Sequence, residues 1–117
     1  FTISRGSRRQ ARVVVAALSP DGAAGRGECV PYARYGETAE GVAAAVEGLP
    51  EGVTRAALAD LLPPGAARNA ADCALWDWEA KRAGVRAWDL AGLPAPGPVE
   101  TAFTLSLDAP AAMEARA

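Results

Sequence analysis

Hydrophobic residues recur with a helical period over the centre of this 117-residue chain, and this is its longest regular pattern. Between Gly65 and Gly84 they fall on one broad arc of a helix. Pro63 prevents an earlier helix from continuing, and Gly84 offers a left-handed stop. The arc consists of Ala66, Ala67, Ala70, Ala71, Cys73, Ala74 and Trp78. We therefore predict one long helix that is buried against more than one neighbour.

Asp77 and Lys81 interrupt this apolar arc. They are four residues apart, so their side chains lie together on one face of a helix and can neutralise each other. A structural ion pair is the favoured interpretation, and a catalytic pair is the alternative.

Earlier in the chain, the pattern changes to short apolar runs of strand length. Ala11–Leu18 is rich in β-branched residues, and Ala24–Val30 follows after the turn sequence Ser19–Gly22. Proline followed by glycine two residues later is typical of a tight turn. These runs predict an antiparallel hairpin.

Two shorter helices are predicted between the hairpin and the central helix. Thr38 and Thr54 are expected to be their N-caps, because a threonine hydroxyl can accept from the first free N–H groups of a helix. The apolar positions that follow these threonines are Val42, Val46 and Leu49, and then Leu58, Leu61 and Leu62. A short helical or turn segment is expected over 85–93.

The last part of the chain predicts the start of a second domain. The proline- and glycine-rich Ala95–Pro98 is a linker signal, and Val99–Leu107 alternates like a strand. A helix is expected to begin at Asp108–Pro110. We predict a first domain over 1–98 and a second over 99–117, and expect both ends to lie within a longer protein.

The composition excludes several classes of partner but does not assign a function. The net charge of −2 argues against nucleic-acid and membrane-surface partners, and no apolar run is long enough to span a bilayer. Cys29 and Cys73 lack metal-site spacing, so we predict buried thiols in a reducing, cytoplasmic setting, with a disulfide as the alternative. The chain has no histidine, and Lys81 is its single lysine. We therefore find no complete active site.

Two loops carry candidate binding residues. Arg5 and Arg8 flank Gly6–Ser7 near the start, where they form either a solvated basic loop or a clamp for a carboxylate. Tyr32 and Tyr35 lie in the loop after the hairpin, where they either pack on the surface or line a pocket.

The motifs RGSRRQARVVV, GRGECVPYARYGE, LPPGAARNAADCALWDWEAK and TAFTLSLDAPAAM, in this order, resemble the N-terminal part of dipeptide epimerases. These enzymes belong to the muconate-lactonizing branch of the enolase superfamily, and the two loop motifs resemble its L-Ala-D/L-Glu epimerase type. The resemblance implies an α+β fold: an enolase-type N-terminal capping domain with an antiparallel β-meander followed by a helical bundle. The meander's first strand would lie before Phe1. The first strand and start of the first helix of a TIM-like (β/α) barrel would follow the cap.

The resemblance also implies the chemistry. A barrel lysine removes the α-proton of a dipeptide, Mg²⁺ held by three barrel carboxylates stabilises the enolate, and a second lysine returns a proton to the other face. All of these groups would lie outside the 117 residues. No catalytic or metal-ligating residue is therefore assigned, and we expect the chain alone to be inactive.

Substrate-binding roles carry over only where the motifs match. Arg5 and Arg8 would bind the side-chain carboxylate of a glutamyl substrate, and Tyr32 and Tyr35 would wall the pocket. Thr104 and Ser106 match the end of the first barrel strand, with ordinary strand hydroxyls as the alternative reading. The expected partners are an acidic dipeptide, the rest of the barrel and further copies of the protein.

Other assignments stay open. Cycloisomerases, N-acylamino-acid racemases and o-succinylbenzoate synthases of the same branch share this cap. A non-catalytic interaction module or a truncated fragment is the alternative outside that branch, because the chain itself offers no metal site and no proton-transfer pair.

Overall fold

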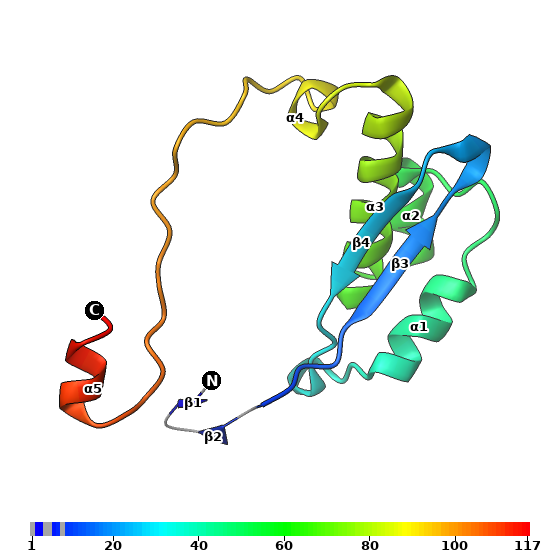
Figure 1. The fold of residues 1–117 in the computed structure, drawn as a ribbon. Coiled ribbons are helices and arrows are strands. Elements are labelled where there is room, and N and C mark those ends of the chain that lie inside the picture. The colour runs from blue at the N-terminus through cyan, green and yellow to red at the C-terminus, as the bar shows by residue number, and fades with distance from the viewer. Residues whose placement is uncertain (1, 4–5, 8) are drawn as a thin grey trace. The chain divides into compact units, whose positions relative to one another are not determined.

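The computed structural model describes residues 2–3, 6–7 and 9–117. The chain divides into two compact units. The larger unit is Arg12–Ala95, and the smaller one combines Phe1–Ala11 with Pro96–Ala117. Figure 1 labels the elements of both units.

The larger unit begins with the predicted hairpin, which is confirmed. Strand β3 (Val14–Leu18) pairs antiparallel with β4 (Gly25–Cys29), and a 3₁₀ turn, η1 (Pro20–Gly22), joins them. Ala16 lies opposite Gly27 in this register, and both are buried. Their sequence neighbours on each strand are exposed, so one face of the hairpin is covered and the other is open.

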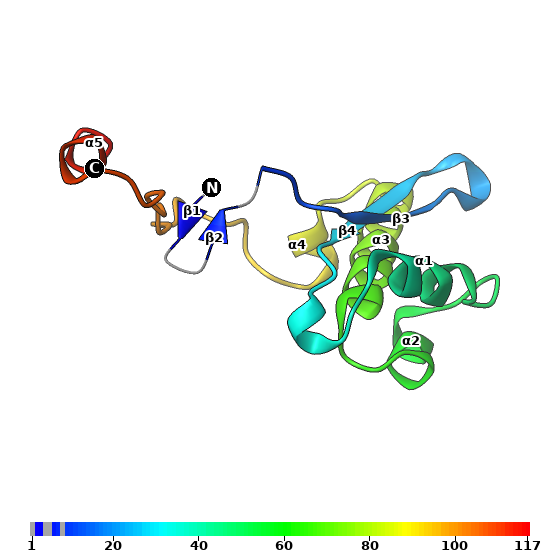
Figure 2. The same cartoon turned by 90° about the horizontal axis from the view of Figure 1, so that it is seen from below.

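Helices α1 (Ala39–Glu47) and α2 (Arg55–Leu61) begin at the predicted caps. Thr38 Oγ1 accepts from the N–H of Gly41 at 3.0 Å, and Thr54 Oγ1 accepts from the N–H of Ala57 at 3.2 Å. A threonine cap of this kind stabilises a helix by about 1 kcal/mol. Figure 2 shows α1, α2 and the long helix α3 (Ala66–Ala83) on the same face of the hairpin.

Helix α3 ends at Gly84, which takes the predicted left-handed conformation with φ 67°. Its residues belong to two separate hydrophobic clusters, so its burial against several neighbours is confirmed. Ala70 and Ala74 pack with the hairpin and α1, together with Ala16, Cys29 and Val42. Ala71 and Leu75 pack with Leu58 of α2. The helix α4 (Ala87–Leu90) follows, where a short helical segment was expected.

Helix α3 lies directly against the backbone of β4, because Gly25 and Gly27 have no side chains there. A Cβ atom added at Gly27 would stand 2.7 Å from the nitrogen of Ala74 and 2.8 Å from Cβ of Cys73, and would overlap the carbonyl oxygen of Ala70. A Cβ atom added at Gly25 would likewise stand 2.7 Å from the nitrogen of Trp78. The two glycines are therefore required by a close approach.

Polar side chains of α3 bind the outer edge of β4. Asp77 Oδ2 accepts from the N–H of Arg26 at 2.9 Å and pairs with Lys81 Nζ at 2.7 Å. Lys81 Nζ also donates to the carbonyl of Ala24 at 3.1 Å, and Asn69 Nδ2 donates to that of Glu28 at 3.4 Å. The predicted ion pair is thus confirmed, and it satisfies backbone groups that β3 leaves unpaired.

One burial prediction on α3 is wrong. Cys29 is buried as expected, but Cys73 is exposed, and both thiols are free. Cys73 lies on the same side of α3 as Asn69, Asp77 and Lys81, because these residues are spaced four positions apart. That side runs along the edge of β4 rather than under the hairpin, so Cys73 faces outwards.

Two short strands and one helix are formed by the described residues of the smaller unit. Strands β1 (Thr2–Ile3) and β2 (Gly6–Ser7) pair antiparallel. The carbonyl of Thr2 accepts from the N–H of Leu107 at 2.8 Å, so the two ends of the chain meet within this unit. Helix α5 (Pro110–Glu114) confirms the predicted C-terminal helix.

The strand predicted over Val99–Leu107 is not formed, so this prediction is wrong. The segment carries no strand assignment, and Phe103 is 82% exposed and Val99 76% exposed. A strand is stable only when its backbone groups pair with a neighbour. Apart from the bond of Leu107 to Thr2, the described residues provide this segment with no such backbone partner. The domain division at residue 98 stays a prediction.

Candidate functional site

The loop that joins β4 to α1 brings two exposed tyrosines together. We call residues 31–37 the tyrosine loop. Tyr32 and Tyr35 have ring centroids 6.3 Å apart, with their ring planes inclined by 54°. A single 3₁₀ turn, η2 (Ala33–Tyr35), holds them, and the N–H of Tyr35 donates to the carbonyl of Tyr32 at 2.9 Å. Gly36 closes the turn with φ 75°. The tyrosines thus form a paired aromatic surface.

Glu37 ends the tyrosine loop and joins it to α3. Its Oε2 accepts from the N–H of Tyr32 at 3.0 Å, and its Oε1 accepts from the N–H of Ala66 at 2.7 Å. These hydrogen bonds, first that of Ala66 and then that of Tyr32, lower the pKa of the Glu37 carboxyl. Glu37 is therefore a carboxylate at neutral pH.

An open hollow of about 420 Å³ lies between the tyrosine loop, the end of β4 and the start of α3. Its lining includes Cys29, Tyr32, Tyr35, Glu37, Ala66 and Asn69. Burial raises the pKa of the Cys29 thiol, so this group stays protonated and is no nucleophile at neutral pH. The hollow has aromatic walls and hydrogen-bonding groups, which suit binding rather than bond chemistry.

A larger hollow of about 820 Å³ lies elsewhere, between the turn of the hairpin, the segment joining α1 to α2, and α3. Ala16, Ala71, Ala74 and Leu75, which form parts of the two hydrophobic clusters, line it. This lining makes it a packing feature of the core, and we assign no site there despite its greater volume.

The sequence-predicted site residues are distributed over both units. Tyr32 and Tyr35 share one hollow, as the pocket interpretation requires. Thr104 is exposed and Ser106 is partly buried, and both lie on the extended segment of the smaller unit. Arg5 and Arg8 lie outside the described residues. The assembly of all six into one substrate site stays a prediction.

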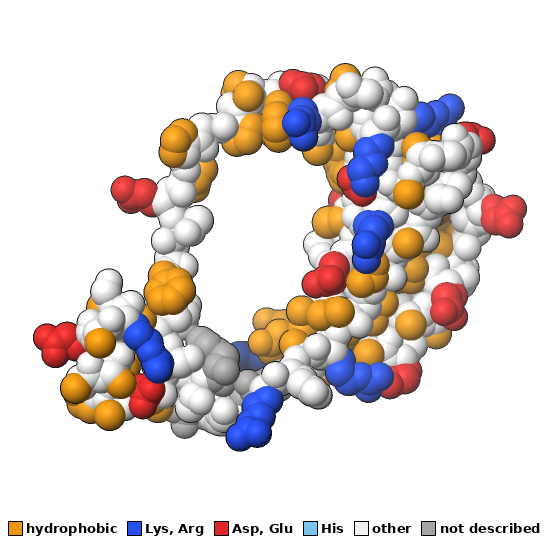
Figure 3. All heavy atoms as spheres, viewed as in Figure 1, with side chains coloured by type: hydrophobic (Ala, Val, Ile, Leu, Met, Phe, Trp, Pro, Cys, Tyr) orange, Lys and Arg blue, Asp and Glu red, His pale blue; other side chains and the backbone are white. Residues whose placement is uncertain are grey.

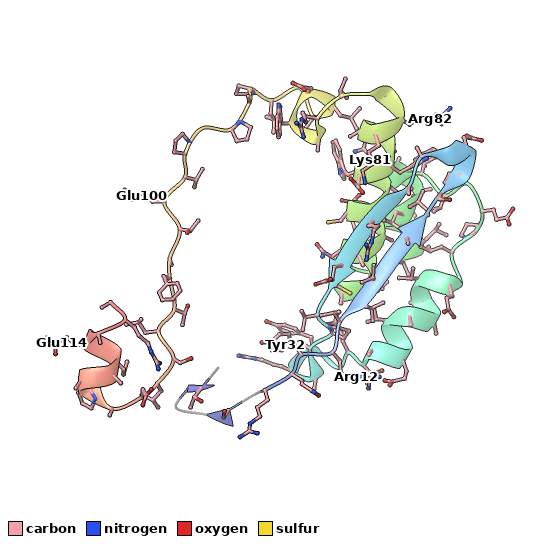
Figure 4. The ribbon with its side chains drawn as sticks, in the orientation of Figure 1. Arg12, Tyr32, Lys81, Arg82, Glu100 and Glu114 are labelled. Carbon is pink, nitrogen blue, oxygen red and sulfur yellow. The ribbon has the colours of Figure 1, made fainter. Side chains whose placement is uncertain are left out.

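The lysine of this chain is held in a structural role. Lys81 lies at the opposite end of β4 from Tyr32 (Figure 4), where Asp77 and the carbonyl of Ala24 bind its ammonium group. The lysine hydrogen bond is the main cause that lowers the pKa of the Asp77 carboxyl. Within residues 2–3, 6–7 and 9–117, no three His, Cys, Asp or Glu side chains gather to hold a metal ion. The residues present therefore do not fit a Mg²⁺ site.

The surface of the larger unit shows mixed charge. On the face visible in Figure 3, basic and acidic side chains alternate over this unit, with hydrophobic side chains between them. In the described part of the chain, no helix combines the length and apolar character needed to cross a bilayer.

Glu37 is the residue of this site that sequence patterns missed. Its partner Ala66 is 29 positions away, and no periodic pattern connects a loop carboxylate to a distant helix start. The available signal was local: the sequence Tyr-Gly-Glu places a carboxylate directly after a turn glycine. In addition, Gly65 precedes α3 without a side chain that could cap it.

Comparison with known proteins identifies relatives over nearly the whole chain. Residues 1–92 match the mandelate racemase / muconate lactonizing enzyme N-terminal domain. The chain is 49% identical over 114 residues to the L-Ala-D/L-Glu epimerase of Escherichia coli strain K12, covering 94% of this chain and 36% of that protein. It is 38% identical over 96 residues to an N-acetyl-D-glutamate racemase of Pseudoalteromonas sp., covering 77% and 30% respectively.

Solved structures of related proteins are also similar to this chain. One is an enolase family member from Agrobacterium tumefaciens with homology to dipeptide epimerases, described with bound sodium, L-Ala-L-Glu and an ordered loop. It matches with a TM-score of 0.87 and 50% identity, over 99% of this chain and 37% of that one. An L-Ala-D/L-Glu epimerase matches with a TM-score of 0.78 and 47% identity, over 88% and 34%. The chain thus spans about a third of the length of its relatives.

Proposed function

The chain belongs to the mandelate racemase / muconate lactonizing enzyme N-terminal domain family, and from this premise we propose that it is the substrate-selecting cap of a dipeptide epimerase. The whole protein would invert the α-carbon of a glutamyl residue by removing and returning a proton. The observation that carries the proposal is the 50% identity, over 99% of the chain, to a structure described with L-Ala-L-Glu. A small-molecule site of this kind would be completed by the rest of the protein.

The proton chemistry would be carried out by residues outside this chain. An α-proton is too weakly acidic to leave unless positive charge stabilises the oxyanion that forms. The described residues hold no cluster that fits a metal, and Lys81 is bound to Asp77. Family resemblance supports Mg²⁺ and a lysine pair on the barrel.

In this proposal the cap selects the substrate. Tyr32 and Tyr35 provide an aromatic wall beside the hollow, where a hydrocarbon stem can pack. Arg5 and Arg8 would bind the glutamyl carboxylate, because a guanidinium offers two parallel N–H donors to the two oxygens. Thr104 and Ser106 would face the same substrate from the start of the barrel. The ordered loop described for the Agrobacterium relative supports a loop that closes over a bound dipeptide.

The second candidate is racemisation of an N-acylated glutamate. The relative from Pseudoalteromonas is named an N-acetyl-D-glutamate racemase and is 38% identical. The two candidate substrates share a glutamate whose nitrogen is acylated, so one cap chemistry suits both. A cytoplasmic location is part of the proposal.

The test is a proton-exchange assay on the full-length protein in D₂O with added Mg²⁺. We expect the glutamyl α-proton of L-Ala-L-Glu to be replaced by deuterium while L-Ala-D-Glu appears. Slower or no exchange is expected with L-Ala-L-Leu, which lacks the carboxylate. Faster turnover of N-acetyl-D-glutamate than of either dipeptide would select the second candidate. Exchange with none of these compounds would contradict both.

A further inference from the structure

We propose that Glu37 is a positioning residue, which fixes the tyrosine loop on α3 and thereby sets the preference for the substrate side chain. Glu37 itself is not expected to touch the reacting atoms. The inference rests on the proposed function for its substrate, but its structural part can be tested separately.

The first observation is that the tyrosine loop is closed on itself. The carbonyl of Tyr32 accepts from the N–H groups of Tyr35 at 2.9 Å and of Glu37 at 3.2 Å, and the N–H of Gly36 donates to the carbonyl of Ala33 at 3.0 Å. Such a turn can move as one body, because its hydrogen bonds lie within it. Its location on the protein must therefore be set by contacts that leave the loop.

The second observation is that Glu37 makes such a contact with a rigid partner. One carboxylate oxygen accepts from the N–H of Tyr32 inside the loop, and the other accepts from the N–H of Ala66 at the first position of α3. Helix α3 is anchored in both hydrophobic clusters, so its start provides a fixed reference point. Glu37 thus connects the tyrosines to the most firmly packed element of the larger unit.

The third observation concerns charge. The start of α3 lacks a capping side chain of its own, since Gly65 precedes it. Glu37 supplies the missing acceptor, and the helix dipole favours a negative charge at this end. Both oxygens are engaged by backbone N–H groups, so the carboxylate is stabilised as an anion in the position that joins the tyrosine loop to α3.

Two variants separate this role from a general loss of folding. Glu37→Gln keeps the size of the side chain but leaves one good acceptor where there were two. Ala66→Pro removes the N–H donor from the other side, at the first helical position, where proline fits. The control is Glu51→Gln, which removes the same charge from an exposed position between α1 and α2.

The structural arm measures amide hydrogen exchange in the full-length protein. Loss of a hydrogen bond to a charged group predicts that exchange over the tyrosine loop accelerates by about tenfold or more in Glu37→Gln and Ala66→Pro. Exchange in β3 and in the centre of α3 should stay unchanged, as should that of Glu51→Gln throughout. If the exchange rate over the tyrosine loop is unchanged in both variants, the inference is overturned, independently of the effect on catalysis.

The functional arm compares L-Ala-L-Glu with L-Ala-L-Leu as substrates. Both variants should raise KM for the acidic dipeptide by about tenfold, with kcat within about threefold, and so lower the preference for it. If amide exchange over the tyrosine loop accelerates but the preference for the acidic dipeptide does not change, Glu37 has only a structural role and the inference fails. If the unmodified protein turned over neither dipeptide, the proposed function would fail, while the exchange result would still decide the structural part.

Discussion

Replacing Gly27 by alanine tests the contact on which the larger unit is built. The added Cβ would stand 2.7 Å from the nitrogen of Ala74 and would overlap the carbonyl oxygen of Ala70. Both partners are backbone atoms of α3, so neither can rotate away as a flexible side chain would. The helix would have to move away from β4 as a whole.

The magnitude follows from the balance of two effects. Overpacking of a buried position costs about 1–3 kcal/mol, and the cost here belongs at the upper end because Ala70 and Ala74 are 0% exposed and cannot adjust. Replacing glycine by alanine also restricts the unfolded chain, which returns about 0.4–1 kcal/mol. We expect Gly27→Ala to lower the free energy of unfolding by about 2 kcal/mol.

Urea denaturation followed by circular dichroism measures this difference. The matched control is Gly97→Ala, where an added Cβ meets no atom within 4 Å and the backbone needs no positive φ. The control should be neutral or slightly stabilising. If the two variants had the same stability, the close packing of α3 on β4 would be refuted.

Three further predictions concern individual side chains. Asp77→Ala should lower the free energy of unfolding by about 1 kcal/mol, because it removes the acceptor for Lys81 and for a β4 N–H near the surface. Urea denaturation measures this loss, with Asp60→Ala at an exposed position as the control. Equal losses of stability in the two variants would contradict the prediction. The folded-state pKa of Glu37 is depressed below its ordinary value of 4.5, so its stabilisation is present above that value and is lost as pH falls through the folded pKa. The stability difference between the unmodified protein and Glu37→Gln should therefore shrink on acidification, and a constant difference from pH 7 to acid denaturation would speak against it. Arg8→Ala should raise KM for an acidic dipeptide far more than for a neutral one in steady-state kinetics, and equal increases would exclude a carboxylate clamp.

The regular elements of this fold could be predicted because their signals are local. Thr38, Thr54 and Gly84 act on their own helix ends, and the hairpin follows from two apolar runs around a turn. The capping fold itself was predicted by resemblance, and both the family match and the solved structures confirm it.

Features that depend on how two elements pack together could not be predicted from the sequence. The exposure of Cys73 depends on where the edge of β4 runs along α3, and a helical arc contains no such information. Val99–Leu107 has the alternation of a strand, but alternation supplies no partner for its backbone. Glu37 acts through a helix that begins 29 residues later.

The most direct test of the central claim is the exchange of the glutamyl α-proton of L-Ala-L-Glu in D₂O, followed by proton NMR with equal amounts of the full-length protein and of the 117-residue chain. We predict deuterium incorporation and formation of L-Ala-D-Glu with the full-length protein, and no exchange with the chain alone. Exchange catalysed by the 117 residues themselves would contradict the assignment of proton transfer to the rest of the protein, and a full-length protein inert toward this dipeptide would contradict the cap's proposed substrate.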